Sequence, residues 1–357
     1  MILKECFTKE WIETVRERFH YNDVNLIEKV IRAFSLVEML SEAGCPFIWK
    51  GGSSLMLILG SSLHRLSIDV DIVCPPGTDI ESYIAKFHKY GFTGHETVER
   101  ELRDTSVPKS HEKLHYRIAY LSRTDRTESI LLDVLYEDAQ YERVKTLKVE
   151  SPFIRLDGEA LTVKVPSVDD ILADKLTAFA PNTSGIPYYK NGYPRFVEVI
   201  KQLYDVGRLF DKMTDLSTVR RVCFRIANIE LAYKHLSNNP AVVFQDIRDT
   251  ALCLATRGMA GRGDFEALQK GINFIRPFMY QSNYYIEDAI IDAAKAACLA
   301  TAIEKGAESI QRYDCSKSDQ ILYPAISDKL YKLRGYLPEA FHYWAVTSKL
   351  LAFGEKA

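Results

Sequence analysis

The sequence predicts an α+β protein in which a domain with a mixed β-sheet precedes an α-helical bundle. Segments of strand composition alternate with helical segments up to about residue 210, and every later apolar segment recurs at helical spacing. The length of 357 residues also exceeds what one hydrophobic core usually holds, roughly 250–300 residues. We therefore expect two domains, residues 1–210 and 211–357.

The first half of the chain alternates helices with short strands. Apolar residues recur at helical spacing over residues 23–42, a short apolar strand (46–50) ends in two glycines, and a short helix follows to residue 59. A second strand, 68–73, alternates with period two. The other elements expected here are a helix over 80–90, hairpin strands over 114–121 and 130–136, a strand over 161–165, and helices over 168–180 and 196–210.

From about residue 211 onward the pattern is helical throughout, which predicts an antiparallel bundle. The expected helices cover residues 217–236, 241–256, 264–276, 286–305, 319–331 and 338–353.

The composition excludes several classes of protein. Hydrophobic residues make up 47% and charged residues 26%, which is too apolar for a disordered chain. Lys and Arg total 46 against 48 Asp and Glu, so a site for a polyanion must be local. Seven scattered cysteines argue against a disulfide framework and a thiolate zinc site. The charged N-terminus and the lack of a long apolar segment predict a cytoplasmic protein without a membrane span.

The strongest candidate for chemistry begins with the run Lys50-Gly51-Gly52-Ser53-Ser54. Two adjacent glycines let backbone N–H groups approach an anion closely. The serines at the start of the next helix add hydroxyl donors and the positive end of the helix dipole. We therefore predict that Gly52, Ser53 and Ser54 form a phosphate cradle.

The second half of this candidate is the run from Arg65 to Asp71 with the pattern Arg-x-Ser-x-Asp-x-Asp. Asp69 and Asp71 are expected on one face of a strand, where their repulsion is relieved if Mg²⁺ ions lie between them and a triphosphate. Gly-Gly-Ser alone is usually a turn, and Asp-x-Asp alone is usually a solvated strand. Their combination predicts a nucleotide site, in which Lys50 and Arg65 either contact substrate or only neutralise the carboxylates.

The pattern Gly-Gly-Ser, helix, Arg-x-Ser-x-Asp-x-Asp resembles the first motif of the AbiEii/MenT nucleotidyltransferase toxins, which belong to the DNA polymerase beta-like superfamily. Residues 168–178 resemble the lysine-bearing helix of that family, which implies that Lys175 holds the triphosphate. Residues 200–206 resemble its K-D-x-x-D element, with Asp205 as the second acid and Gln202 in place of the first.

The resemblance implies a polymerase beta-like core and a transferase that moves a nucleoside monophosphate from an NTP to an acceptor with Mg²⁺ (or Mn²⁺). It also implies the toxin of a toxin–antitoxin system, with the 3′ end of tRNA or another RNA as acceptor and an AbiEi-like winged-helix protein as antitoxin. Protein nucleotidylation and nucleotide binding without turnover remain alternatives.

Asp133 stands inside an otherwise apolar run. A buried carboxylate is costly unless it is paired or bound to a metal. In polymerase beta-like folds a third carboxylate on a neighbouring strand completes the metal cluster or acts as a base, and we expect Asp133 in that role. The alternative is a structural acid at a strand end.

His111-Glu-Lys-Leu-His115 matches the H-E-x-x-H motif of zinc proteases, with Glu112 as general base. That chemistry requires a helix, whereas the residues that follow have strand composition. On a strand the two histidines would lie about 13 Å apart, too far to share one ion. Zinc proteolysis is therefore a minor alternative.

Two further segments carry basic residues. The loop 188–195 interleaves tyrosines with Lys190 and Arg195, so it either stacks on a base as single-strand binders do or is a surface loop. Arg220, Arg221 and Arg225 share one helical face, which either contacts an RNA backbone or is merely solvated.

Overall fold

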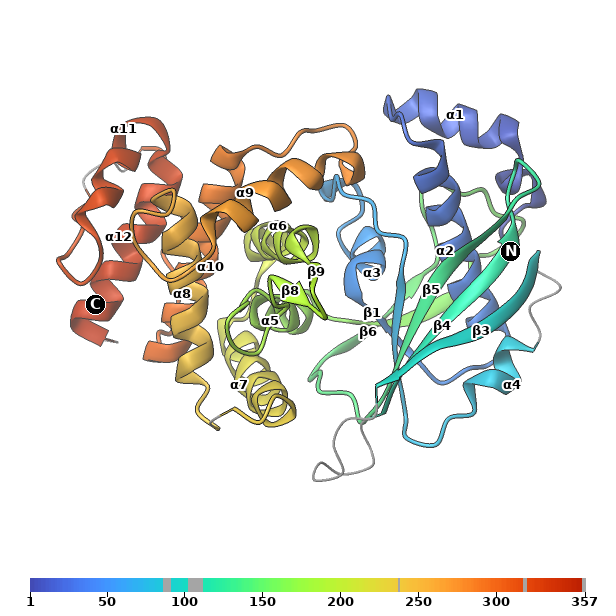
Figure 1. Cartoon of the computed structure of the whole chain (residues 1–357), viewed down its shortest axis with the longest axis horizontal. Coiled ribbons are helices and arrows are strands. Elements are labelled where there is room, and N and C mark those ends of the chain that lie inside the picture. The colour runs from blue at the N-terminus through green and yellow to red at the C-terminus, as the bar shows by residue number, and fades with distance from the viewer. Residues whose placement is uncertain (86–90, 102–111, 237, 317–319, 355–357) are drawn as a thin grey trace. The chain divides into compact units, whose positions relative to one another are not determined.

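The computed structural model describes residues 1–85, 91–101, 112–236, 238–316 and 320–354 (Figure 1). These residues form two compact units. The first unit comprises Met1–Ser167 and Pro277–Asn283, and the second comprises Val168–Arg276 and Tyr284–Ala357. The domain boundary expected between residues 210 and 211 stays a prediction.

A seven-stranded mixed sheet forms the centre of the first unit (Figure 1). Its strand order is β3-β4-β5-β2-β1-β7-β6. β5 runs parallel to β2 and β7 runs parallel to β1, while the other neighbours are antiparallel. The strands are β1 (Ile48–Lys50), β2 (Val70–Cys74), β3 (Phe92–Glu101), β4 (Glu112–Leu121), β5 (Thr127–Tyr136), β6 (Val144–Lys148) and β7 (Thr162–Pro166).

One face of this sheet is covered by α2 (Val24–Glu42), as the helical spacing predicts. The carboxylate of Asp23 accepts hydrogen bonds from the backbone N–H groups of Asn25 and Leu26 and so caps the helix. The ring of Phe34 on α2 packs edge-on against Trp49 of β1, with centroids 5.5 Å apart. The other helices of this unit are α1 (Lys9–Phe19), α3 (Gly51–Ile58) and α4 (Ile80–Ile84).

Two strands of the first unit were not expected from the sequence, and one expected helix of the second unit is wrong. β6 exposes most of its side chains, so it lacks an apolar alternation, and β3 is also rich in polar residues. The helix expected over 319–331 is replaced in the described part by irregular chain and a 3₁₀ turn, Asp328–Lys332. Pro324 lacks the N–H that a helix interior needs. The end of the helix expected over 80–90 lies outside the described residues.

The second unit is a helical bundle, which confirms the α+β class with C-terminal helices. Its longest helix, α10, is rich in alanine and buried over most of its surface between α8, α12 and α6, which is the pattern of a central helix. The helices are α5 (Val168–Ala178), α6 (Phe196–Lys212), α7 (Leu216–Tyr233), α8 (Ala241–Ala255), α9 (Phe265–Phe274), α10 (Ile286–Lys305), α11 (Leu333–Tyr336) and α12 (Pro338–Phe353), with the small hairpin β8 (Tyr189–Lys190) and β9 (Tyr193–Pro194).

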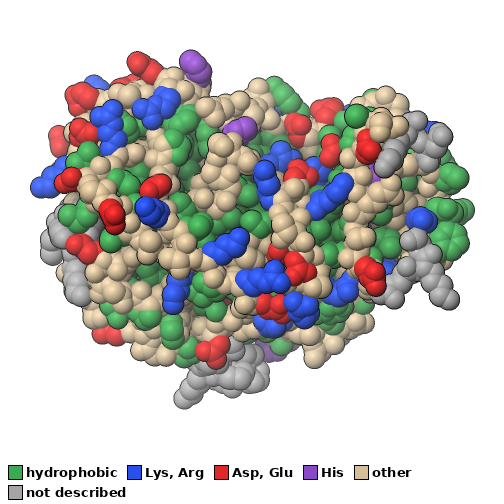
Figure 2. Space-filling view, turned by 180° about the vertical axis from the view of Figure 1, so that it is seen from behind, with side chains coloured by type: hydrophobic (Ala, Val, Ile, Leu, Met, Phe, Trp, Pro, Cys, Tyr) green, Lys and Arg blue, Asp and Glu red, His purple; other side chains and the backbone are tan. Residues whose placement is uncertain are grey.

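The surface and the cysteines agree with the composition. On the face shown in Figure 2, Lys and Arg side chains are interspersed with Asp and Glu. All seven cysteines are free thiols, and only Cys315 is exposed. Across the residues that the structure describes, no helix combines the length and the hydrophobicity needed to cross a membrane.

A buried ionic network joins α6 to α10 in the second unit. The carboxylate of Asp292 is fully buried, accepts hydrogen bonds from Arg208 at 2.7 Å and from the Tyr284 hydroxyl at 3.0 Å, and has its pKa raised to about 6 by burial. Gly207 makes room for it, because a Cβ on this glycine would lie 2.0 Å from Oδ1 of Asp292.

Gly207→Ala should lower the free energy of unfolding by about 3 kcal/mol or more, because the added methyl displaces a buried carboxylate from its partners. Gly335→Ala on α11 is the matched control, since a Cβ there meets no atom within 4 Å. The control should be neutral or gain up to about 1 kcal/mol from helix propensity. Urea unfolding of both variants measures the difference, and equal stabilities would contradict the prediction.

Candidate active site

The first glycine of the pair lies directly over Asp71. β1 ends at Lys50, which pairs in register with Asp71 on the antiparallel strand β2. Gly51 then adopts a left-handed backbone conformation (φ +76°), and a Cβ on it would lie 2.0 Å from Oδ2 of Asp71. Only glycine therefore fits at this position, for both conformational and steric reasons.

The second glycine, Gly52, packs against Arg65 and Ser67 in the second half of the motif. A Cβ on Gly52 would lie 2.6 Å from Oγ of Ser67 and 2.8 Å from Nη2 of Arg65. Arg65 is only 1% exposed, and its Nη1 donates to the carbonyl of Leu66 at 3.1 Å. The two halves of the sequence pattern are thus brought together in the fold, at the N-terminal end of α3.

The two serines after the glycines are completely buried. The hydroxyl of Ser53 accepts a hydrogen bond from the indole N–H of Trp49 at 3.0 Å, and the hydroxyl of Ser54 donates to the carbonyl of Gly51 at 3.0 Å. These contacts fix the start of α3 against β1. That these hydroxyls hold a triphosphate stays a prediction; the groups they contact in this structure belong to the protein itself.

Two of the three predicted metal ligands are neighbours on the sheet. Asp71 on β2 and Asp133 on β5 are direct partners in the parallel register, so they share one face. β2 begins at Val70, so the expectation that two aspartates lie on this strand holds only for Asp71, and Asp69 lies one residue before it.

Asp133 already has two partners in the protein. Its Oδ1 lies 2.6 Å from Nδ1 of His115, its register partner on β4, and its Oδ2 lies 3.7 Å from Nζ of Lys113. Burial raises the pKa of Asp133, but the hydrogen bond from His115 and the charge of Lys113 outweigh burial and hold the pKa below its usual value. The carboxylate is therefore ionised at neutral pH, and Nδ1 of His115 carries the shared proton.

Sequence reasoning missed His115 as the partner of Asp133. The expected hairpin could have indicated this pair, because antiparallel pairing of its two strands places His115 opposite Asp133, the one acid in the apolar run. Strand β4 spans Glu112–Leu121, so a helix over Glu112 and His115 is not formed, as expected. His111 lies outside the described residues.

The residues Lys175 and Asp205, identified by separate motifs, form a buried ion pair in the second unit. Nζ of Lys175 on α5 lies 3.1 Å from Oδ2 of Asp205 on α6, and it donates to Oε1 of Gln202 at 3.0 Å. Lys175 is 7% exposed and Asp205 is fully buried. Gln202, which departs from the family motif, thus still binds the lysine through its amide oxygen.

Among the described residues, no group of three or more His, Cys, Asp or Glu side chains is arranged to hold a metal ion by itself. Mg²⁺ usually binds one or two carboxylates and completes its shell with water and substrate phosphates. The adjacent carboxylates of Asp71 and Asp133, beside the start of α3, fit that mode of binding.

One family model and two solved structures are similar to this chain. A family model described as "Nucleotidyl transferase AbiEii toxin, Type IV TA system" matches residues 35–272. The solved structure of JHP933 from Helicobacter pylori is 16% identical, with 78% of this chain and 90% of that chain covered and a TM-score of 0.39. A second H. pylori protein, a proposed nucleotidyltransferase, is also 16% identical, with 80% and 97% covered and a TM-score of 0.39. No curated protein sequence matches the chain significantly.

His115→Leu should lower the free energy of unfolding at pH 7 by about 1.5–3 kcal/mol, because the Asp133 carboxylate loses a charge-assisted hydrogen bond. A carboxylate with a depressed pKa stabilises the fold above its unfolded pKa and loses that contribution as pH falls through the folded pKa. The difference from wild type should therefore shrink below about pH 4.

His115→Asn is the matched control for this substitution, because its amide N–H can donate from nearly the same place as Nδ1. Unfolding measured across pH should show partial recovery in this variant. A difference that does not depend on pH, or no gain from asparagine, would assign the loss to packing alone.

Proposed function

Because the chain belongs to the family of AbiEii nucleotidyl transferase toxins of type IV toxin–antitoxin systems, we propose that it transfers a nucleoside monophosphate from an NTP to an RNA acceptor, the 3′ end of tRNA. The acceptor hydroxyl gives its proton to a base, for which Asp133 is the candidate, and its oxygen bonds to the α-phosphorus. The bond from that phosphorus to the oxygen bridging to the β-phosphate breaks, and pyrophosphate leaves. A cytoplasmic location and an AbiEi-like winged-helix antitoxin are part of this proposal.

The close fit of the glycine pair against Asp71 and Arg65 carries the proposal. Because neither Gly51 nor Gly52 has a side chain, the backbone that begins α3 packs directly against Asp71 and Arg65. We propose that a phosphate binds the N–H groups of this backbone, beside the carboxylates. Asp69, Asp71 and Asp133 would hold Mg²⁺, which neutralises the triphosphate charge and assists departure of pyrophosphate. The buried guanidinium of Arg65 fixes the segment that leads into Asp69.

Asp133 is suited to orient the acceptor as well as to bind a cation. With His115 and Lys113 on its two oxygens, its carboxylate is fixed and ionised beside Asp71. From the family motifs we propose that Lys175 binds the triphosphate and that Asp205 positions Lys175, through the ion pair that links α5 to α6.

The hairpin β8–β9 supports RNA as the acceptor. Its turn, Asn191-Gly192, has positive φ at both residues, which matches the tight turn that fixes a two-residue hairpin. Tyr193 is 71% exposed and is the cross-strand neighbour of Lys190. An exposed aromatic ring beside a cation is the arrangement on which unpaired bases stack.

Protein nucleotidylation and nucleotide binding without turnover predict different results in one assay. The protein is incubated with Mg²⁺, each labelled NTP and total RNA, and label is followed in RNA, in protein and in released pyrophosphate. We expect label at RNA 3′ ends. Label on protein alone would move the acceptor to protein, and binding without pyrophosphate release would reduce the chain to a binding module.

Asp71→Ala and Asp69→Ala should each reduce this labelling by about 10³-fold or more, because the ligands of a catalytic cation supply several kcal/mol of transition-state stabilisation. Asp157→Asn, an exposed acid distant in sequence from the motif, is the control and should label normally. Label that persists in Asp71→Ala would refute the metal assignment.

Lys175→Met should destabilise the protein by about 3–5 kcal/mol, because Asp205 is then left buried without its cation. Lys175→Met combined with Asp205→Leu removes both charges and should recover most of that stability. If Lys175 binds the triphosphate, the recovered double variant should still label RNA poorly, with a raised KM for NTP. A stable double variant with normal kinetics would make the pair purely structural.

A further inference from the structure

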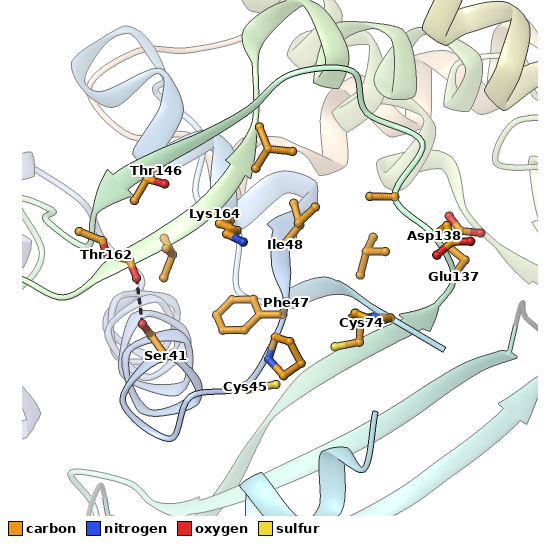
Figure 3. Close-up of a pocket in the computed structure, with 16 residues that line it drawn as sticks. Ser41, Cys45, Phe47, Ile48, Cys74, Glu137, Asp138, Thr146, Thr162 and Lys164 are labelled. Carbon is orange, nitrogen blue, oxygen red and sulfur yellow. Dashed lines mark hydrogen bonds between the residues drawn. The ribbon is translucent and has the colours of Figure 1, made fainter. Parts of the chain in front are cut away.

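The first unit contains a cavity of about 520 Å³ (Figure 3). Its floor is apolar and includes Phe47, Ile48 and Val73. Lys164 and Thr146 line one side, and Glu137 and Asp138 line the other. The lining residues all belong to the first unit, so the cavity is complete within it.

Ile48 and Val73 of the floor lie on the sheet face that carries the candidate metal ligands. Ile48 pairs in register with Val73 on β2 and with Lys164 on β7. On the same two strands, the pair Lys50 and Asp71 lies two residues away from the pair Ile48 and Val73. Residues two apart in a strand share a face and lie about 6.6 Å apart, so the cavity begins one step from Asp71.

The walls offer donors and acceptors in separate places. In Figure 3 the apolar floor around Phe47 and Ile48 lies between the Lys164 side chain and the Glu137 and Asp138 carboxylates. A nucleobase matches this distribution, because its ring faces are apolar and its edge carries both N–H donors and carbonyl or ring-nitrogen acceptors. The volume is also in the range of small-molecule sites, about 300–1,000 Å³.

We propose that this cavity binds a nucleobase of the reacting nucleotides, with carboxylates accepting from its N–H groups and Lys164 or Thr146 donating to its carbonyl groups. The incoming NTP and the terminal nucleoside of the acceptor share this chemistry. That the phosphates react beside Asp71 rests on the proposed function, whereas binding of the base rests on the cavity itself.

Binding of free nucleosides tests the cavity without phosphate, metal or turnover. Adenosine, guanosine, cytidine and uridine are titrated separately into the full chain by calorimetry. Val144→Trp blocks the cavity from β6, where this valine lines it and is 40% exposed. Val98→Trp is the matched control, since this valine is 46% exposed on β3 and does not line the cavity.

At least one nucleoside should bind the wild type and Val98→Trp equally, and Val144→Trp should weaken it by about tenfold or more, or 1.4 kcal/mol. Glu137→Gln combined with Asp138→Asn should change which nucleoside binds best. Absence of binding by all four nucleosides, or equal affinity in Val144→Trp, would overturn the proposal.

Kinetics of Val144→Trp then identify the source of the base. A raised KM for NTP assigns the cavity to the incoming nucleotide, and a raised KM for RNA assigns it to the acceptor; both constants unchanged would overturn the proposal. Asp71→Ala should retain nucleoside binding, so failure of the transferase proposal leaves this binding test intact.

Discussion

The close approach of the Gly51–Gly52 backbone to Asp71 and Arg65 is the constraint on which the candidate site depends. A side chain on either glycine would overlap these groups, and the left-handed conformation of Gly51 would itself be strained in any other residue. Because β1 ends exactly there, the first peptide groups of α3 lie beside the carboxylate face of the sheet. The hydrogen bonds from Trp49 to Ser53 and from Ser54 to the Gly51 carbonyl hold the start of α3 in this position.

The acidic and basic groups are fixed by specific partners, as burial requires. Asp133 is held by His115 and Lys113, and Lys175 is held by Asp205 and Gln202. Ionised groups removed from water are costly unless such partners compensate them. Such partners fix the position of each group within the fold, and fixed charged groups are the kind of arrangement that electrostatic catalysis requires.

The sequence predicts the parts of this fold that have a strong local pattern. The strand, glycine turn and helix around Gly51 were correct, as were the β4–β5 hairpin and the main helices of the bundle. The edge strand β6 was missed because its exposed, lysine-bearing pattern has no apolar alternation. The helix expected over 319–331 failed because apolar residues on both sides of Pro324 imitate helical spacing in a segment that is largely irregular.

Contacts between distant residues explain the remaining differences at the site. Motifs identified Asp133, Lys175 and Asp205 but gave no information on their partners, because strand register and helix packing decide which side chains meet. His115 is the clearest case: its motif suggested zinc, while its register opposite Asp133 makes it the partner of a carboxylate. Asp69 lies just outside β2, where periodicity alone could not locate the strand end.

A crystal structure with Mn²⁺ and a non-hydrolysable NTP analogue tests the central claim most directly. The account predicts anomalous density for Mn²⁺ bound to a carboxylate oxygen of Asp71 and a triphosphate oxygen on the backbone N–H groups that begin α3. A nucleotide bound elsewhere, with Asp71 free of metal, would contradict it.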